Sequence, residues 1–178
     1  AYHELRRIAQ ARGTQIVWRP ILLGGVFQAT GNHSPAEIPA KAKHLNVDMQ
    51  RWAKAYGVPF TMNPHFPINT LALMRGAMAM QQRGEEPFQR YLAAMFSAMF
   101  ERPRNLNNPM EIGAVLAEAG FDPMECMQAV QAPAVKEALK AATAEAVARG
   151  VFGVPTFFVG DEMFWGQDRL HFVDAALA

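Results

Sequence analysis

Apolar positions recur along most of this chain with the period of an α-helix. Two segments, 109–119 and 123–131, begin with a capping residue, Asn108 or Asp122, followed by proline at the first helical position. Glycine follows several of the others, as it does at helix ends. The pattern predicts helices at 2–12, 41–56, 70–83, 87–100, 109–119, 123–131 and 134–149, and a last one from about residue 168.

A smaller part of the pattern is typical of β-structure. Residues 14–20, TQIVWRP, are β-branched and aromatic and predict a strand. Two short apolar runs, PTFFV and EMFW, flank Gly160-Asp161 and predict a β-hairpin. The intervening segment 21–39 is rich in glycine, proline and polar residues and predicts a long loop.

The order of these elements indicates a sheet domain interrupted by a helical insertion. A helix at the very start implies a preceding strand, because two parallel strands need a crossover connection between them. A β-α-β half followed by α-β-β-α is the thioredoxin-like arrangement. We therefore expect an α/β chain in which the first strand and the turn into the first helix lie upstream of Ala1.

Composition narrows the functional classes. The net charge is +1, and no basic run is interleaved with aromatic residues, so neither nucleic acid nor a membrane surface is an expected partner. Polar residues interrupt every long apolar stretch, which excludes a membrane-spanning segment. A single cysteine, Cys126, excludes an internal disulfide and favours a reducing, cytoplasmic compartment. The five histidines lack ligand spacing, so no metal site is expected.

Residues 153–170, GVPTFFVGDEMFWGQDRL, carry the strongest candidate chemistry. A cis bond before Pro155 costs only about 0.5–1 kcal/mol. In that form it leaves the N–H and C=O of Val154 unpaired, so they can bond the backbone of a peptide-like ligand. The alternative is an ordinary trans proline at the start of a strand.

The motif FGVPTFFVGDEMFWGQDRL resembles the 2-hydroxychromene-2-carboxylate isomerases, relatives of the kappa-class glutathione transferases within the DsbA-like group. The resemblance extends through AYHELRRIA, GNHSPAEIPAKAKHL and MQRWAKAYGVPF, whereas residues 71–132 match only in pattern. It implies a thioredoxin-like domain with a large all-helical insertion. The implied divisions are 1–36 and 133–178 for the two parts of the thioredoxin-like domain, and 37–132 for the insertion.

The resemblance also implies a glutathione site. Val154 would pair its backbone with the cysteinyl unit, and the γ-glutamyl end would be held by Trp165, Gly166, Gln167 and Asp168. The carboxylate of Asp168 can accept a hydrogen bond from the ligand's ammonium group, and the start of the last helix offers N–H groups to the ligand's carboxylate. Asn32 and Lys41 match positions that lie at the cleft in these relatives. Alternatively, Asp168 is a plain helix N-cap and Lys41 a solvated surface lysine.

The organic substrate has three candidate contacts, Phe27, His65 and Asn69. His65 is otherwise an ordinary loop histidine. Relatives place a serine near the glutathione sulfur at the turn before the first helix. That position is expected upstream of Ala1, so the catalytic residue is unknown here.

The implied function is a glutathione-dependent cis-trans isomerase of 2-hydroxychromene-2-carboxylate or a similar small aromatic carboxylate. The reaction would run through thiolate addition, bond rotation and elimination. Three alternatives stay open: a DsbA-like dithiol-disulfide oxidoreductase, a kappa-like glutathione transferase, and a non-catalytic binding module. The relatives also imply a homodimer.

Overall fold

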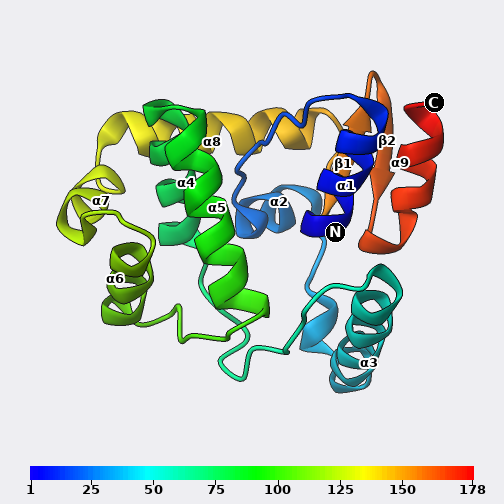
Figure 1. Ribbon diagram of the computed structural model, residues 1–178, viewed down its shortest axis with the longest axis horizontal. Coiled ribbons are helices and arrows are strands. Elements are labelled where there is room, and N and C mark those ends of the chain that lie inside the picture. Colours follow the sequence, from blue (N-terminus) through cyan, green and yellow to red (C-terminus); the bar gives the residue numbers. More distant parts are fainter. The chain divides into compact units, whose positions relative to one another are not determined.

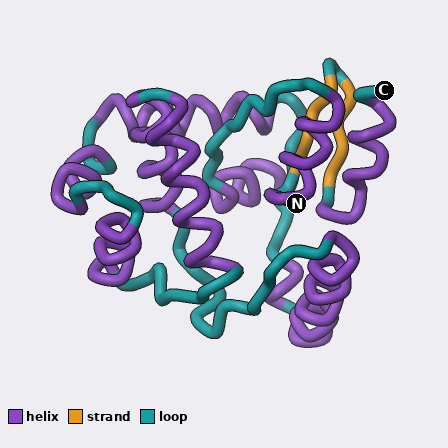
Figure 2. Tube along the Cα trace, in the orientation of Figure 1, coloured by secondary structure: helices purple, strands orange, loops and turns teal.

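The computed structural model describes all residues 1–178 and contains nine α-helices and one two-stranded sheet (Figure 1). Figure 2 shows the hairpin as the only strands among the helices. No helix combines the length and the apolar character needed to cross a membrane. The helices are α1 (Tyr2–Arg12), α2 (Leu23–Thr30), α3 (Pro39–Tyr56), α4 (Leu71–Arg83), α5 (Glu85–Phe100), α6 (Pro109–Glu118), α7 (Pro123–Ala129), α8 (Pro133–Ala148) and α9 (Leu170–Ala176). The strands are β1 (Thr156–Val159) and β2 (Glu162–Trp165), and two short 3₁₀ helices are η1 (Pro35–Glu37) and η2 (Gln167–Arg169).

Local chemistry determines where several helices begin or end. The Asn108 side chain accepts a hydrogen bond from the N–H of Met110 at 3.0 Å, which satisfies a donor at the start of α6. Asp122 caps α7 in the same way. Helices α1 and α3 end at Gly13 and Gly57, which adopt left-handed φ values of 63° and 62°. The predicted helix starts and stops are therefore confirmed at these positions.

Two predicted segments are wrong. Residues 14–20 form no strand, because β1 and β2 pair only with each other and offer this segment no partner. Val17 accordingly leaves 69% of its surface exposed. The predicted loop at 21–39 contains α2 and η1. The adjacent glycines of α2 oppose helix formation, but the burial of Val26 outweighs that preference.

The chain forms two compact units. The first consists of residues 1–19, 23–58 and 146–178. Its core joins α1 and α9 to the hairpin, since Ile8, Leu170 and Val173 pack together with partly buried hairpin residues, Phe157, Val159 and Phe164. The register pairs Thr156 with Trp165 and Phe157 with Phe164.

The second unit, residues 20–22 and 59–145, is helical. Helices α4 and α5 pack closely because Gly76 leaves room for the Tyr91 hydroxyl, which donates to the C=O of Leu73 at 2.8 Å. Cys126 is buried in this unit, and its burial raises the pKa of the thiol. A compact unit need not coincide with a domain that folds alone, so the predicted insertion at 37–132 stays a prediction.

Candidate functional site

The open end of the hairpin exposes the peptide of Val154. The Val154–Pro155 bond is cis. The Thr156 hydroxyl donates to the C=O of Gly153 at 2.7 Å, and the N–H of Gly166 donates to the C=O of Pro155 at 2.9 Å. The N–H and C=O of Val154 take no part in these bonds, and Val154 is 47% exposed. Its backbone is therefore available to a ligand.

Trp165 lies beside this exposed peptide. It ends β2, and its ring centre lies 5.1 Å from that of Phe152. A Cβ at position 153 would lie 2.8 Å from the indole Nε1, so only glycine permits this approach. The arrangement places the indole of Trp165 against Phe152 and Gly153, the two residues just before Val154.

Asn32 anchors the residues just before Val154. Its Nδ2 donates to the C=O of Phe152 at 2.8 Å, and its Oδ1 accepts from the N–H of His33 at 2.8 Å. The structure therefore brings Asn32 to the predicted site, with its amide already engaged by the backbone. Lys41 is exposed on the first turn of α3, and no hydrogen bond or ion pair links it to these residues.

Gly166 and Asp168 are closely interdependent. Gly166 is buried with φ 106° and ψ 145°, a conformation that other residues rarely adopt. A Cβ on Gly166 would collide with Oδ1 of Asp168. The other carboxylate oxygen of Asp168 accepts from Nε of Arg169 at 3.1 Å. Arg169 is the N-cap of α9, and Gly166 is the N-cap of η2, so the alternative interpretation of Asp168 as the cap of the last helix is wrong.

Gln167 is held by two residues that the sequence interpretation missed. The hydroxyl of Tyr56 donates to the C=O of Gln167 at 2.6 Å. The Gln167 side-chain amide donates to Oδ2 of Asp48 at 3.4 Å. Burial is the main cause that raises the pKa of Tyr56, followed by the negative charges of Glu4 and Asp168. The one available sequence indication was the spacing of Asp48 and Tyr56, which are two helical turns apart.

The three substrate candidates belong to different units. Phe27 is partly buried on α2 in the first unit. His65 and Asn69 are exposed in the loop before α4, in the second unit. This loop contains a second cis bond, Phe66–Pro67, which the sequence did not reveal.

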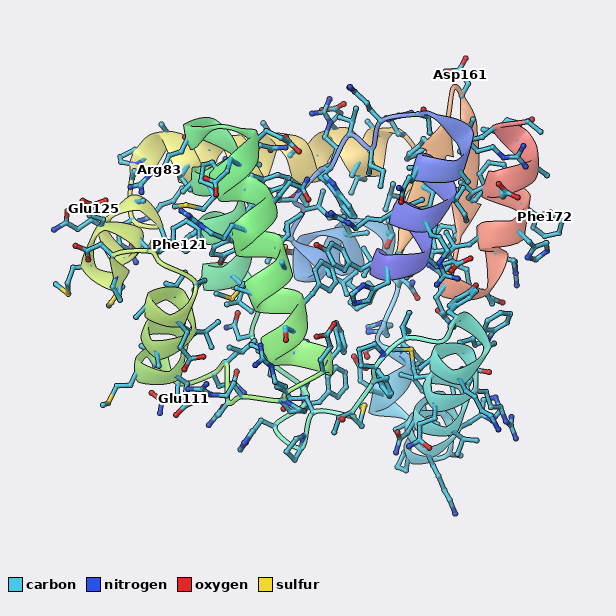
Figure 3. The ribbon with its side chains drawn as sticks, in the orientation of Figure 1. Arg83, Glu111, Phe121, Glu125, Asp161 and Phe172 are labelled. Carbon is cyan, nitrogen blue, oxygen red and sulfur yellow. The ribbon has the colours of Figure 1, made fainter.

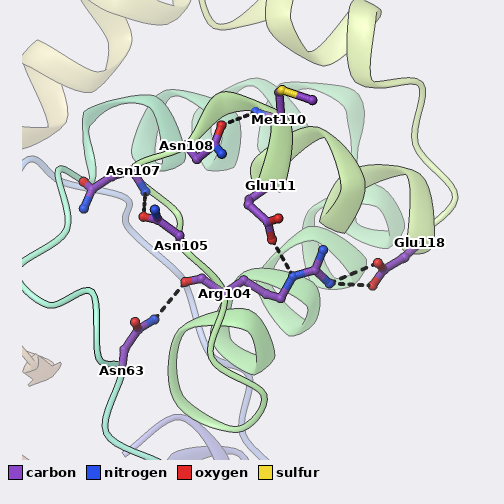
Figure 4. Close-up of polar contacts among 8 residues, drawn as sticks. All are labelled: Asn63, Arg104, Asn105, Asn107, Asn108, Met110, Glu111 and Glu118. Carbon is purple, nitrogen blue, oxygen red and sulfur yellow. Dashed lines mark hydrogen bonds and ion pairs between the residues drawn. The ribbon is translucent and has the colours of Figure 1, made fainter.

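Asparagine side chains hold that loop, and Figure 4 shows the bond from Asn63 to Arg104. Asn63 is only 4% exposed; its Oδ1 accepts from the N–H of His65 at 2.9 Å, and its Nδ2 donates to the C=O of Arg104 at 3.1 Å. Asn107 accepts from the N–H of Asn69 at 2.9 Å through its Oδ1. Both candidate residues are thus held by their backbone and are exposed, and the Oδ1 of Asn69 also accepts from the N–H of Leu71 at 3.0 Å.

Arg104 extends this network to α6. Its Nε lies 2.7 Å from Oε2 of Glu111, and its Nη1 lies 3.1 Å from Oε1 of Glu118. Figure 4 shows the guanidinium between the two carboxylates. These ion pairs link the segment between α5 and α6 to α6 and account for Arg104 structurally.

Comparison with known proteins places this geometry in a family. The chain matches the DSBA-like thioredoxin domain over residues 1–178. It is 30% identical over 176 residues to the 2-hydroxychromene-2-carboxylate isomerase of Sphingobium xenophagum, covering 98% of this chain and 88% of that protein. It is 25% identical over 175 residues to glutathione S-transferase kappa 1 of Caenorhabditis elegans, covering 92% of this chain and 77% of that protein.

A solved structure shows the same likeness in three dimensions. A 2-hydroxychromene-2-carboxylate isomerase superposes with a TM-score of 0.86 at 30% identity, over 98% of this chain and 85% of that one. The predicted thioredoxin-like fold with a helical insertion is confirmed, and so is the family that the sequence resembles.

Proposed function

Since the chain belongs to the 2-hydroxychromene-2-carboxylate isomerase family, within the DSBA-like thioredoxin domains, we propose that it isomerises 2-hydroxychromene-2-carboxylate or a similar small aromatic carboxylate with glutathione as cofactor. Relatives that carry this isomerase name support the reaction type. Relatives named as kappa-class glutathione transferases support the cofactor.

One observation carries the glutathione site. The hydrogen bond from the N–H of Gly166 to the C=O of Pro155 joins the two segments of the predicted site at one end of the hairpin. Pro155 directly follows the free peptide of Val154, and Gly166 directly precedes Gln167 and Asp168, which supports a ligand that contacts both segments. A γ-glutamyl-cysteinyl chain offers a matching sequence of groups, a charged ammonium and carboxylate followed by a peptide backbone.

The chain's own residues would bind and orient this cofactor. Val154 would pair with the cysteinyl backbone, Trp165 would cover it, and Asp168 would accept from the ammonium group. When bound, glutathione would supply a thiolate that adds to a conjugated carbon of the substrate, permits rotation and leaves again. Holding both partners in one geometry is the protein's part of the rate enhancement.

The substrate contacts proposed for this reaction are Phe27, His65 and Asn69, with Asn32 and Lys41 near the cofactor. His65 and Asn69 belong to a loop whose backbone is held by asparagine side chains. A rigid backbone of this kind would help two side chains to orient a substrate carboxylate. A homodimer and a cytoplasmic location complete the proposal.

Replacing Asp168 with alanine tests the site. Loss of a charge-assisted hydrogen bond worth about 1.5–3 kcal/mol should weaken glutathione binding roughly 10- to 100-fold in calorimetric titration. Unfolding in urea should change little, because the only partner of this carboxylate is the exposed Arg169. Asp161→Ala at the exposed hairpin tip (Figure 3) is the matched control and should keep full affinity.

The reaction is tested by the same variants. Conversion of 2-hydroxychromene-2-carboxylate to the trans 2-oxo-3-enoate, followed by absorbance, should require glutathione and fall in Asp168→Ala. Conversion without glutathione, or an unchanged glutathione affinity in Asp168→Ala, would reject the assigned site. Formation of a stable glutathione conjugate would favour the kappa-like transferase instead.

A further inference from the structure

Helix α3 presents two polar side chains to Gln167. Asp48 lies two turns before the end of the helix, and Tyr56 is its last residue. Asp48 accepts from the Gln167 side-chain amide at 3.4 Å, while Tyr56 donates to the Gln167 backbone C=O at 2.6 Å. Both the side chain and the backbone of Gln167 are therefore held from one helix.

The chemistry of Asp48 determines how the Gln167 amide is turned. An ionised carboxylate can only accept hydrogen bonds, so the amide nitrogen must face Asp48. The amide oxygen, on the other branch of the same planar group, must then point away from Asp48. This Oε1 atom accepts no hydrogen bond within the chain.

The position of Tyr56 is itself fixed. Its ring packs on Trp52 at 5.3 Å between centres and joins the core cluster of Ile8 and Leu170. Its backbone C=O accepts from Nη2 of Arg7 at 2.8 Å. Burial raises the pKa of Tyr56, so the hydroxyl remains a donor through the neutral and mildly alkaline range.

We propose that Asp48 and Tyr56 are positioning residues that turn the amide oxygen of Gln167, beside the Asp168 carboxylate, toward the ammonium group of glutathione. The inference rests on the proposed function, and it assigns recognition of one group of the cofactor. An ammonium group has three donors and no acceptor, so it requires two or three oxygens and no competing amide N–H. Asp48 prevents the orientation in which the Gln167 amide nitrogen would point at the ammonium group.

The test compares two ligands, glutathione and glutaryl-cysteinyl-glycine, which lacks only the amino group. The wild-type protein should bind glutathione roughly 10- to 100-fold more tightly than the analogue, because the analogue lacks the group that Asp168 and Gln167 would contact. Asp48→Asn should reduce glutathione affinity roughly 5-fold, because asparagine can hydrogen-bond either the nitrogen or the oxygen of the Gln167 amide and so no longer fixes its orientation. The same substitution should leave binding of the analogue unchanged. Tyr56→Phe should act in the same direction.

A double-mutant cycle separates positioning from direct attraction by the charge of Asp48. In a Gln167→Leu background, Asp48→Asn should have no further effect on glutathione binding. An equal loss in both backgrounds would overturn the inference, because the charge would then act on the ligand through space. Equal wild-type affinity for the two ligands would also overturn it, while leaving the proposed cofactor intact. Failure to bind either ligand would reject the proposed function together with the inference.

Discussion

Replacing Gly166 with alanine should displace the carboxylate of Asp168. The added methyl group would collide with Oδ1 of Asp168, and Gly166 is buried, so the methyl group cannot turn to solvent. The backbone at this position also has φ 106°, where only glycine is comfortable. Both effects act on the same short segment of the proposed glutathione site.

The expected losses of stability and of glutathione affinity follow from these two effects. A non-glycine residue in such a conformation costs about 1–3 kcal/mol of stability. Moving Asp168 away from the ligand ammonium removes a charge-assisted hydrogen bond of about 1.5–3 kcal/mol, or roughly 10- to 100-fold in affinity. Gly160→Ala is the control, because Gly160 has φ 57° but no atom lies within 4 Å of the added Cβ. It carries the conformational cost without the collision.

Urea unfolding and calorimetric titration with glutathione separate the two costs. Both variants should unfold at lower urea concentration than wild type. Only Gly166→Ala should bind glutathione more weakly under conditions where both variants are folded. Equal glutathione affinities of the two alanine variants would refute the link between Gly166 and the position of Asp168.

Two further predictions concern stability. Gly76→Ala should lower the free energy of unfolding by about 1–3 kcal/mol, because the added methyl group meets the Tyr91 hydroxyl. In a Tyr91→Phe background this loss of stability should be smaller. Equal losses in the two backgrounds would contradict the packing of Gly76 against Tyr91. The Arg12 hydrogen bond lowers the pKa of Asp174 below 3.8, so their pairing stabilises the fold above that value and is lost as the pH falls through the lowered pKa. Asp174→Asn should therefore be less stable than wild type at neutral pH, and urea unfolding should show the difference disappearing in acid. A difference independent of pH would contradict this assignment.

Much of the fold could be predicted because its causes are local. A capping side chain, a proline or a left-handed glycine acts within a few residues, as Asn108, Asp122 and Gly57 show. The hairpin followed from Gly160, whose φ of 57° suits a tight turn. Such residues can be identified from the sequence alone, because they act on the helix or turn in which they stand.

The errors and omissions arise from long-range contacts. Residues 14–20 have the composition of a strand, but a strand also needs a neighbour, which composition does not reveal. Helix α2 forms despite two adjacent glycines because Val26 is buried. Tyr56 contacts Gln167 across 111 positions, so no periodicity could have paired them. The sequence therefore indicated candidate residues in the hairpin motif but not Asp48 and Tyr56, which contact Gln167 from α3.

The discontinuity of the first unit has a consequence for synthesis. Its three segments are separated by residues 20–22 and 59–145, which make up the second unit. The second unit is almost continuous in sequence and helical, so its contacts are mostly short-range and can form early. The hairpin and α9 leave the ribosome after the second unit. Asn32, Asp48 and Tyr56 can therefore form their hydrogen bonds to Phe152 and Gln167 only after that unit has been synthesised. The proposed cofactor site is thus among the last features of the chain to be assembled during translation.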